Sequence, residues 1–247
     1  MAGPAFRMLV EGEGGIVVEL GDAIDPSLNA WVHRLADAVR SELAADVLEV
    51  VPTYRSLLVL FDPLRRGRRE LEGRIAALLG GVSKGSRRVR PARVVRVPVR
   101  YGGPDGPDLA FVAEQARLTV DEVVSIHASV AYRVYMIGFT PGFPYLGGMS
   151  ERIAAPRLDT PRTRIPAGSV GIAGAQTGVY PVESPGGWRL VGRTPLRLFD
   201  PRSGEPFLVA AGDRVRFVPV DDEAFREVER QVEAGAYRPE AEEGEGP

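Results

Sequence analysis

An excess of arginine over acidic residues marks the part of the chain between Gly138 and Phe199. This part holds three acidic residues and seven arginines, which are Arg152, Arg157, Arg162, Arg164, Arg189, Arg193 and Arg197. A guanidinium group binds a carboxylate or a phosphate through paired hydrogen bonds. The many glycines of the same part let backbone N–H groups approach an anion closely. The composition therefore predicts a surface suited to an anionic ligand.

Arg193 is the arginine that we expect to be functional. It lies in the segment VGRTP, where we expect a turn between two strands. Arg189 and Arg197 instead flank apolar residues, as outward-facing positions of a strand do, so their placement requires no ligand. Arg164 is a further candidate for binding the substrate.

Several uncharged polar residues in the same part of the chain are also candidates for ligand contacts. They are Gln176, Thr177 and Tyr180 in GAQTGVYPV and Ser184 in ESPGGW. His127 falls at the end of a predicted helix, where the helix dipole favours a protonated imidazole. Two roles for His127 stay open, namely a cap of that helix and proton transfer in catalysis.

The loop GFTPGFPYLGGM at 138–149 is unusual because it combines four glycines with three aromatic residues. Tight turns explain the glycines but not Phe139, Phe143 and Tyr145. We interpret these three aromatic residues as a surface that contacts a partner or shapes the site, with packing into the core as the alternative. We place Gly186 and Gly187 of ESPGGW in the same site-shaping group.

The chain lacks the residues that several other kinds of active site require. The chain has no cysteine, which excludes disulfides and thiolate nucleophiles. The single lysine, Lys84, lies outside any phosphate-binding loop of the Walker type. The segment nearest to a serine nucleophile elbow has Ala167 where glycine is required. The two histidines, His33 and His127, do not have the spacing of metal ligands, so we expect no metal in this chain.

The elements that position these residues begin with a small N-terminal domain, predicted at 1–88. Its hydrophobic pattern predicts a strand at 16–20, a helix beginning at Asp25-Pro26, strands at 47–51 and 57–61, and a second helix from Leu64 to Leu79. This order is typical of a small α/β sandwich of the split β-α-β kind.

The basic stretch at 84–100 joins this domain to the next. It holds seven basic residues and no acidic one. We favour a linker followed by an edge strand over a nucleic-acid-binding segment, because the net charge of the chain is −2.

The second domain is predicted at 89–235. Two short helices open it, one beginning near Asp108 and one with a capping box from Thr119 to Glu122. Short apolar runs separated by Gly and Pro then predict an antiparallel barrel or sandwich, followed by a helix at 221–235. The acidic tail at 236–247 is expected to be disordered. No apolar run approaches ~18 residues and no signal peptide is recognisable, so we expect a cytoplasmic protein with no membrane partner.

Several longer segments of the sequence resemble one protein family. They include PVRYGGPDGPDLAFVA at 98–113, GFTPGFPYLGG at 138–148, PAGSVGIAG at 166–174 and QTGVYPVESPGGWRLVGRTP at 176–195. With LFDP at 198–201, they resemble the B subunit of 5-oxoprolinase, a family also called allophanate hydrolase subunit 1 or the Kip-type inhibitor. The resemblance runs from about Gly12 to Pro219.

This resemblance implies an α+β protein of two domains, a small α/β sandwich followed by a cyclophilin-like antiparallel β-barrel. It also implies a complex with A and C subunits that cleaves 5-oxo-L-proline to L-glutamate with Mg-ATP, and we expect the chain to be inactive alone. Arg193 and Gln176 would bind the substrate or an activated intermediate, and His127 and Tyr180 would orient it or transfer a proton. The alternatives are a Kip-type inhibitor of a sensor histidine kinase and a carboxyltransferase-type subunit of a urea carboxylase-like complex.

Overall fold

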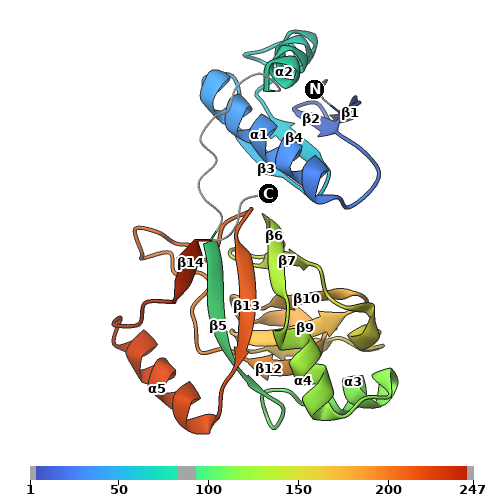
Figure 1. Ribbon diagram of the computed structural model, residues 1–247. Coiled ribbons are helices and arrows are strands. Elements are labelled where there is room, and N and C mark those ends of the chain that lie inside the picture. The colour runs from blue at the N-terminus through green and yellow to red at the C-terminus, as the bar shows by residue number, and fades with distance from the viewer. Residues whose placement is uncertain (1–3, 83–92, 244–247) are drawn as a thin grey trace. The chain divides into compact units, whose positions relative to one another are not determined.

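The computed structural model describes residues 4–82 and 93–243 of the chain (Figure 1). The chain divides into two compact units, residues 1–90 and 91–247. The predicted domain boundary at 88 and 89 lies outside the described residues, as does the basic segment at 84–92. The two units are described one after the other.

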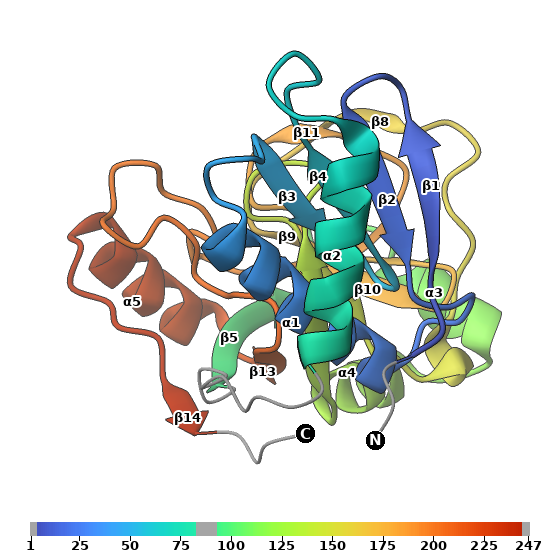
Figure 2. The same ribbon diagram turned by 90° about the horizontal axis from the view of Figure 1, so that it is seen from above.

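The first unit is a four-stranded antiparallel sheet with two helices on one of its faces (Figures 1 and 2). Its strand order is β1-β2-β4-β3. The elements are β1 (Arg7–Glu11), β2 (Gly15–Glu19), α1 (Pro26–Glu42), β3 (Glu49–Pro52), β4 (Ser56–Leu60) and α2 (Arg68–Val82).

The predicted split β-α-β arrangement is confirmed in this unit. β4 lies between β2 and β3 and is antiparallel to both, so β2 and β3 run in the same direction on either side of it. The Asp25 side chain accepts hydrogen bonds from the Ser27 and Leu28 amides at 2.8 and 3.0 Å, and Pro26 opens α1. Val32, Leu35 and Val39 of α1 are fully buried in the core of the unit.

Two details of the first unit differ from the prediction. β1 was not predicted, because its five residues are almost all exposed and show no alternation of apolar and polar positions. The second helix begins at Arg68, so Leu64 lies outside it and is 95% exposed. The residues from Asp62 to Arg66 form a turn, in which the Asp62 carbonyl accepts from the Arg65 and Arg66 amides at 3.0 Å.

The second unit is built on an eight-stranded sheet that closes into a nearly complete barrel. Seven strands follow the order β10-β9-β12-β5-β13-β6-β7, β14 pairs with β5, and the end strands β10 and β7 approach each other. The strands are β5 (Arg93–Tyr101), β6 (Ala131–Ile137), β7 (Pro144–Gly147), β9 (Ser169–Ala173), β10 (Gln176–Val179), β12 (Arg189–Arg193), β13 (Arg214–Pro219) and β14 (Ala241–Glu243).

Helices and a small second sheet complete this unit. The helices are α3 (Leu109–Ala116), α4 (Val120–Ala128), the 3₁₀ turn η1 (Glu151–Ile153) and α5 (Asp222–Glu233). The small sheet pairs β8 (Arg162–Ile165) with β11 (Ser184–Gly186). The capping box predicted for α4 is confirmed, because Thr119 and Glu122 each bind the other's backbone amide. None of the helices in the described residues is long and apolar enough to cross a membrane.

β5 is an interior strand, so its prediction as an edge strand is wrong. It pairs with β13 on one side, and with β14 and β12 on the other. The β5–β13 pair is parallel, so the predicted barrel is present but is not wholly antiparallel. The arginines of β5 form ion pairs with acids distant in sequence, such as Arg93 with Asp213 at 3.1 Å.

The C-terminal tail was predicted to be disordered, and this is wrong for the residues that form β14. They pair antiparallel with the start of β5, and the Glu240 carbonyl accepts from the Arg96 amide at 3.0 Å. The Glu240 and Glu242 carboxylates lie 3.2 and 3.5 Å from the Arg96 guanidinium. The acidic residues of the tail therefore complement the basic residues of β5. Residues 244–247 lie outside the described part.

Candidate functional site

Five aromatic residues gather in the second unit and form what we call the aromatic cluster: Phe139, Phe143, Tyr145, Tyr180 and Trp188. The Phe143 ring lies at its centre and is 3% exposed. Its centroid is 5.3 to 5.8 Å from those of the other four rings, with interplanar angles of 67° to 88°. These are edge-to-face contacts, each of which contributes beyond the apolar area it buries.

Glycines make room for the cluster. A Cβ atom on Gly178 of β10 would lie 3.0 Å from Phe143 Cζ and 3.2 Å from Trp188 Cζ3. A Cβ atom on Gly186 of β11 would overlap the Tyr180 hydroxyl oxygen. Any side chain at either position would displace a ring, which agrees with a site-shaping role for Gly186. The Cβ of a residue at Gly187 would make only ordinary contacts.

Phe139 differs from the other members of the cluster because it is 70% exposed. Its φ angle is +65°, in the left-handed region that bulky residues rarely adopt. A tight turn holds it there, in which the Thr140 amide donates to the Gly138 carbonyl at 2.8 Å and the Gly138 amide donates to the Phe143 carbonyl at 3.1 Å. Of the three aromatic residues of the loop, Phe139 is exposed, Tyr145 is half-buried and Phe143 is buried. Core packing, the alternative interpretation, holds for Phe143.

Tyr180 is buried against the cluster and remains protonated at neutral pH. Burial raises the pKa of its phenol, and the Trp188 backbone amide and the nearby Arg157 and Arg162 lower that pKa in part. A protonated phenol donates a hydrogen bond to an acceptor such as a carbonyl oxygen. Tyr180 is therefore equipped to orient a ligand.

Arg162 is a fixed cation beside Tyr180. Its guanidinium makes two contacts of 2.9 Å with the Asp108 carboxylate, one to each oxygen. Asp108 is buried and also accepts the Leu190 amide at 2.7 Å. Neither Arg162 nor Asp108 was predicted as a site residue, since they lie 54 residues apart and only the fold joins them.

Arg157 is the second cation at this place. It is exposed, and within the described residues no carboxylate lies at ion-pair distance from it. An unpaired guanidinium near a protonated phenol can bind an anion with little desolvation of other charges. The excess of arginine over acidic residues in the sequence was the signal for it, but that signal did not single out Arg157.

His127 and Thr177 lie elsewhere, inside the barrel. His127 is fully buried; its Nδ1 lies 2.7 Å from the Tyr101 hydroxyl and its Nε2 lies 2.8 Å from Thr177 Oγ1. Thr177 Oγ1 donates to the Gly171 carbonyl at 3.1 Å. The Thr177 hydroxyl proton is thus used, so His127 Nε2–H donates to Thr177 and the Tyr101 hydroxyl donates to Nδ1.

Burial keeps His127 neutral, because it lowers the pKa of the imidazole to about 3. The expectation of a protonated imidazole at the helix end is therefore wrong, and the cap of α4 is Ser129 instead. The ring also stacks on Phe217, with centroids 4.7 Å apart. Direct proton transfer by His127 stays a prediction, and it would require the side chain to leave a saturated core position.

Arg193 is the last residue of β12 and does not lie in a turn, so that part of the prediction is wrong. It pairs in register with Arg100 and Ser169 of the neighbouring strands. Its guanidinium lies 5.8 Å from the Phe225 ring centroid and 3.7 Å from the Glu229 carboxylate, both on α5. Arg193 thus contacts α5, whereas Tyr180 belongs to the aromatic cluster.

The remaining predicted residues surround the small sheet and β10. Arg164 forms an exposed ion pair with Glu183 at 2.7 Å. Ser184 pairs with Ile165, and its hydroxyl is buried without a hydrogen-bond partner among the described residues. Gln176 opens β10 and is half-buried. The structure therefore brings together Tyr180, Gly186 and the loop aromatics, and separately His127 and Thr177.

The cluster and its arginines form one candidate site. The rings of the cluster that are not buried suit contact with a flat or cyclic group, the Tyr180 hydroxyl suits a carbonyl oxygen, and the two arginines suit a carboxylate or phosphate. Within the part of the chain that the structure describes, no three His, Cys, Asp or Glu side chains come together as metal ligands would.

Comparisons with known proteins cover most of the chain. Residues 6–209 match the family model described as carboxyltransferase domain, subdomain C and D. A Bacillus subtilis protein named as the B subunit of 5-oxoprolinase is 42% identical over 228 residues, which cover 87% of this chain and 92% of that protein.

Two solved structures share the fold. The crystal structure of TTHA0988 aligns with a TM-score of 0.73 at 38% identity over 84% of this chain, which spans only 39% of the TTHA0988 chain. The crystal structure of the K. lactis urea amidolyase aligns with a TM-score of 0.81 at 22% identity, over 98% of this chain and 16% of that one. The latter likeness concerns the fold alone.

Proposed function

Because the chain belongs to the family of 5-oxoprolinase B subunits, we propose that it works as the B subunit of an ATP-dependent 5-oxoprolinase. In this proposal the chain joins A and C subunits, and the complex cleaves 5-oxo-L-proline to L-glutamate while hydrolysing Mg-ATP. The observation that carries the proposal is the 42% identity to a protein of that name over nearly the full length of both chains. The chain alone is inactive in this account.

The reaction has a chemical reason to need ATP. The lactam amide of 5-oxoproline is stabilised by resonance, so its carbonyl carbon is a poor electrophile. Transfer of a phosphoryl group from ATP to the lactam oxygen makes that carbon electrophilic. Water then adds to that carbon and the ring C–N bond breaks, which leaves the free amine and an acyl phosphate. A second water hydrolyses the acyl phosphate to the side-chain carboxylate of glutamate and inorganic phosphate. Negative charge spreads over phosphoryl oxygens along this route, and cations and backbone N–H groups stabilise it.

The aromatic cluster offers matching groups for one half of such a site. In our proposal the lactam ring lies against the cluster, the Tyr180 hydroxyl donates to the substrate, and Arg157 binds the substrate carboxylate or the transferred phosphoryl group. Arg162, held by Asp108, keeps the local potential positive. Arg193, Gln176, Thr177, Arg164 and Ser184 stay predicted contacts, and partner subunits supply the groups that bind Mg-ATP.

Reconstitution tests the proposal. The purified chain is mixed with its A and C partners, Mg-ATP and 5-oxoproline, and glutamate and ADP are measured over time. We expect both products in about equal amounts, and none when this chain is omitted. A complex that assembles from all three subunits but forms no glutamate contradicts the proposal.

A second candidate is a carboxyltransferase-type subunit, which the description of the matching family model favours. It predicts transfer of a carboxyl group from a biotinylated carrier to an acceptor such as urea. The same purified complex distinguishes the two, because carboxyl transfer requires the carrier and 5-oxoproline cleavage does not. Inhibition of a sensor histidine kinase stays a prediction.

A further inference from the structure

The edge strand β1 of the first unit has an open side. β1 pairs with β2, and among the described residues no other backbone hydrogen bond reaches residues 7–11. β3, at the other edge of the sheet, is protected. Arg40 donates to the Val50 carbonyl at 2.8 Å, and Pro52 has no N–H group to offer. An unprotected edge is a template for another strand.

The side chains of β1 also leave apolar surface exposed. Leu9 and Val10 are 42% and 53% exposed and point to opposite faces of the sheet. Leu9 stands opposite Val17, Val17 opposite Leu58, and Leu58 opposite Val51. These four residues form an apolar row across the whole sheet, and the row stops at Leu9.

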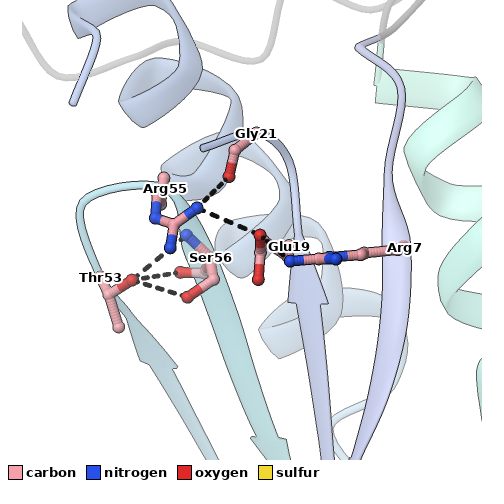
Figure 3. A network of polar contacts seen from close by, with 6 residues as sticks. All are labelled: Arg7, Glu19, Gly21, Thr53, Arg55 and Ser56. Atoms are coloured by element: carbon pink, nitrogen blue, oxygen red, sulfur yellow. Dashed lines mark hydrogen bonds and ion pairs between the residues drawn. The ribbon is translucent and has the colours of Figure 1, made fainter. Parts of the chain in front are cut away.

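The two ends of β1 carry opposite charge. At its start, Arg7 lies 2.8 Å from Glu19, which also lies 3.1 Å from Arg55 (Figure 3). Two guanidinium groups share one carboxylate there, so positive charge is in excess. At its end, Glu11 is exposed, and no cation of the described residues lies at ion-pair distance from it.

We propose that β1 pairs antiparallel with β1 of a second copy of this chain, about a two-fold axis at Leu9. Arg7 of each copy then faces Glu11 of the other, Met8 faces Val10, and Leu9 faces Leu9. The two sheets become one continuous eight-stranded sheet, and the two apolar rows meet at the axis. The pairing is isologous and therefore closed.

Charge selects this register over its alternatives. A parallel pairing in register places Arg7 against Arg7 and Glu11 against Glu11, and like charges directly opposite each other destabilise a sheet. A shift by one residue moves Arg7 away from Glu11 and turns Leu9 away from its counterpart. Of these arrangements, only the antiparallel one centred on Leu9 pairs Arg7 with Glu11 at both ends and also brings the two apolar rows into contact.

The expected dimer is weak because the contact is short. Five residues a side give an interface at the low end of specific contacts, below ~1,200 Å². We therefore expect a dimer that dissociates on dilution. The proposal concerns this chain alone and stands independently of its substrate.

A charge-swap experiment tests the proposal with the full chain. Sedimentation equilibrium measures the dimer dissociation constant of the wild type, Arg7→Glu and Glu11→Arg. In a dimer of either variant, positions 7 and 11 carry the same charge and face each other at both ends of the paired strands. We therefore expect a dimer dissociation constant at least about tenfold higher than that of the wild type. An equimolar mixture of the two variants restores dimerisation, since a strand with arginine at both ends then faces a strand with glutamate at both ends.

Controls separate the pairing from folding and from net charge. Glu13→Arg makes the same charge change in the adjacent turn, outside the proposed pairing, and should leave dimerisation unchanged. Leu9→Lys places two ammonium groups at the axis and should abolish the dimer while thermal unfolding shows a folded chain. The proposal is overturned if the wild type is monomeric at all concentrations, if Glu11→Arg dimerises as well as Glu13→Arg, or if the mixture stays as weak as its components.

Discussion

His127 and Tyr180 are two buried polar residues of the same unit, and their surroundings differ in kind. Every polar atom of the His127 ring is bound within the barrel, by Tyr101 and Thr177. Tyr180 lies among aromatic rings, beside a fixed Arg162 and an unpaired Arg157. A saturated polar group specifies the core, whereas a phenol next to an unpaired cation has binding capacity left for a ligand. This contrast separates a structural site from a candidate functional one.

The largest effect is expected from Phe143→Ala, which removes the centre of the aromatic cluster. Truncation of a buried phenylalanine costs about 3–5 kcal/mol of unfolding free energy, because it removes apolar contacts and leaves a cavity. Denaturant unfolding of the isolated chain measures this. Phe139→Ala is the matched control, with an expected change within about 0.5 kcal/mol, since its ring is exposed. Equal effects of the two substitutions would show that Phe143 is not the centre of the cluster.

A pH-dependent loss of stability is expected from His127. The pKa of its imidazole in the folded chain is about 3, well below the value of about 6.5 for an exposed histidine. Between these values the unfolded chain binds a proton that the folded chain does not. The contribution of neutral His127 to the free energy of unfolding is therefore fully present above about pH 6.5. It is lost as the pH falls towards 3, by up to about 1.4 kcal/mol per pH unit.

His127→Phe isolates this contribution. Urea unfolding at about pH 7 and about pH 5 should show a loss that is larger in the wild type than in the variant by up to about 2 kcal/mol. His33 is present in both proteins, so its titration cancels in the comparison. If both proteins lose the same stability on acidification, His127 is not neutral and buried as described.

The smallest effect is expected from Phe139→Gly. Glycine adopts a positive φ without strain, so the substitution should leave the isolated chain as stable as the wild type or raise its stability by up to about 1 kcal/mol. The same change should weaken assembly with the partner subunits, as titration calorimetry can measure. A variant that binds its partners as tightly as the wild type would remove the interface role of Phe139.

Local elements of the fold were predictable because their signals lie close together in sequence. Asp25-Pro26 at the start of α1 and the Thr119–Glu122 capping box each act within four residues, and both are present. The interior position of β5 was not predictable, since it depends on β13 and β14, more than a hundred residues away. The order of the acidic tail was not predictable for the same reason. Its charge alone suggests disorder, and the compensating cation, Arg96, is distant in the sequence.

The candidate site was predictable only in outline. The segments rich in glycine and arginine indicated the part of the chain in which the candidate site lies. Tyr180 and the aromatic residues of the 138–149 loop contact one another there. Residue type and spacing did not distinguish Arg157 from Arg193, because their difference lies in their neighbours. Arg193 faces Glu229 of α5, whereas no carboxylate of the described residues pairs with Arg157.

The most direct test of the account is the turnover of 5-oxoproline by the assembled complex that carries Arg157→Ala in this chain. Loss of a charged hydrogen bond to the substrate predicts a fall in kcat/KM of about 10- to 100-fold. Arg202→Ala, an exposed arginine paired with Asp200, is the matched control and should retain wild-type turnover. An Arg157→Ala complex as active as the Arg202→Ala complex would contradict the account, and a loss confined to Arg193→Ala would move the site to the α5 side of the barrel.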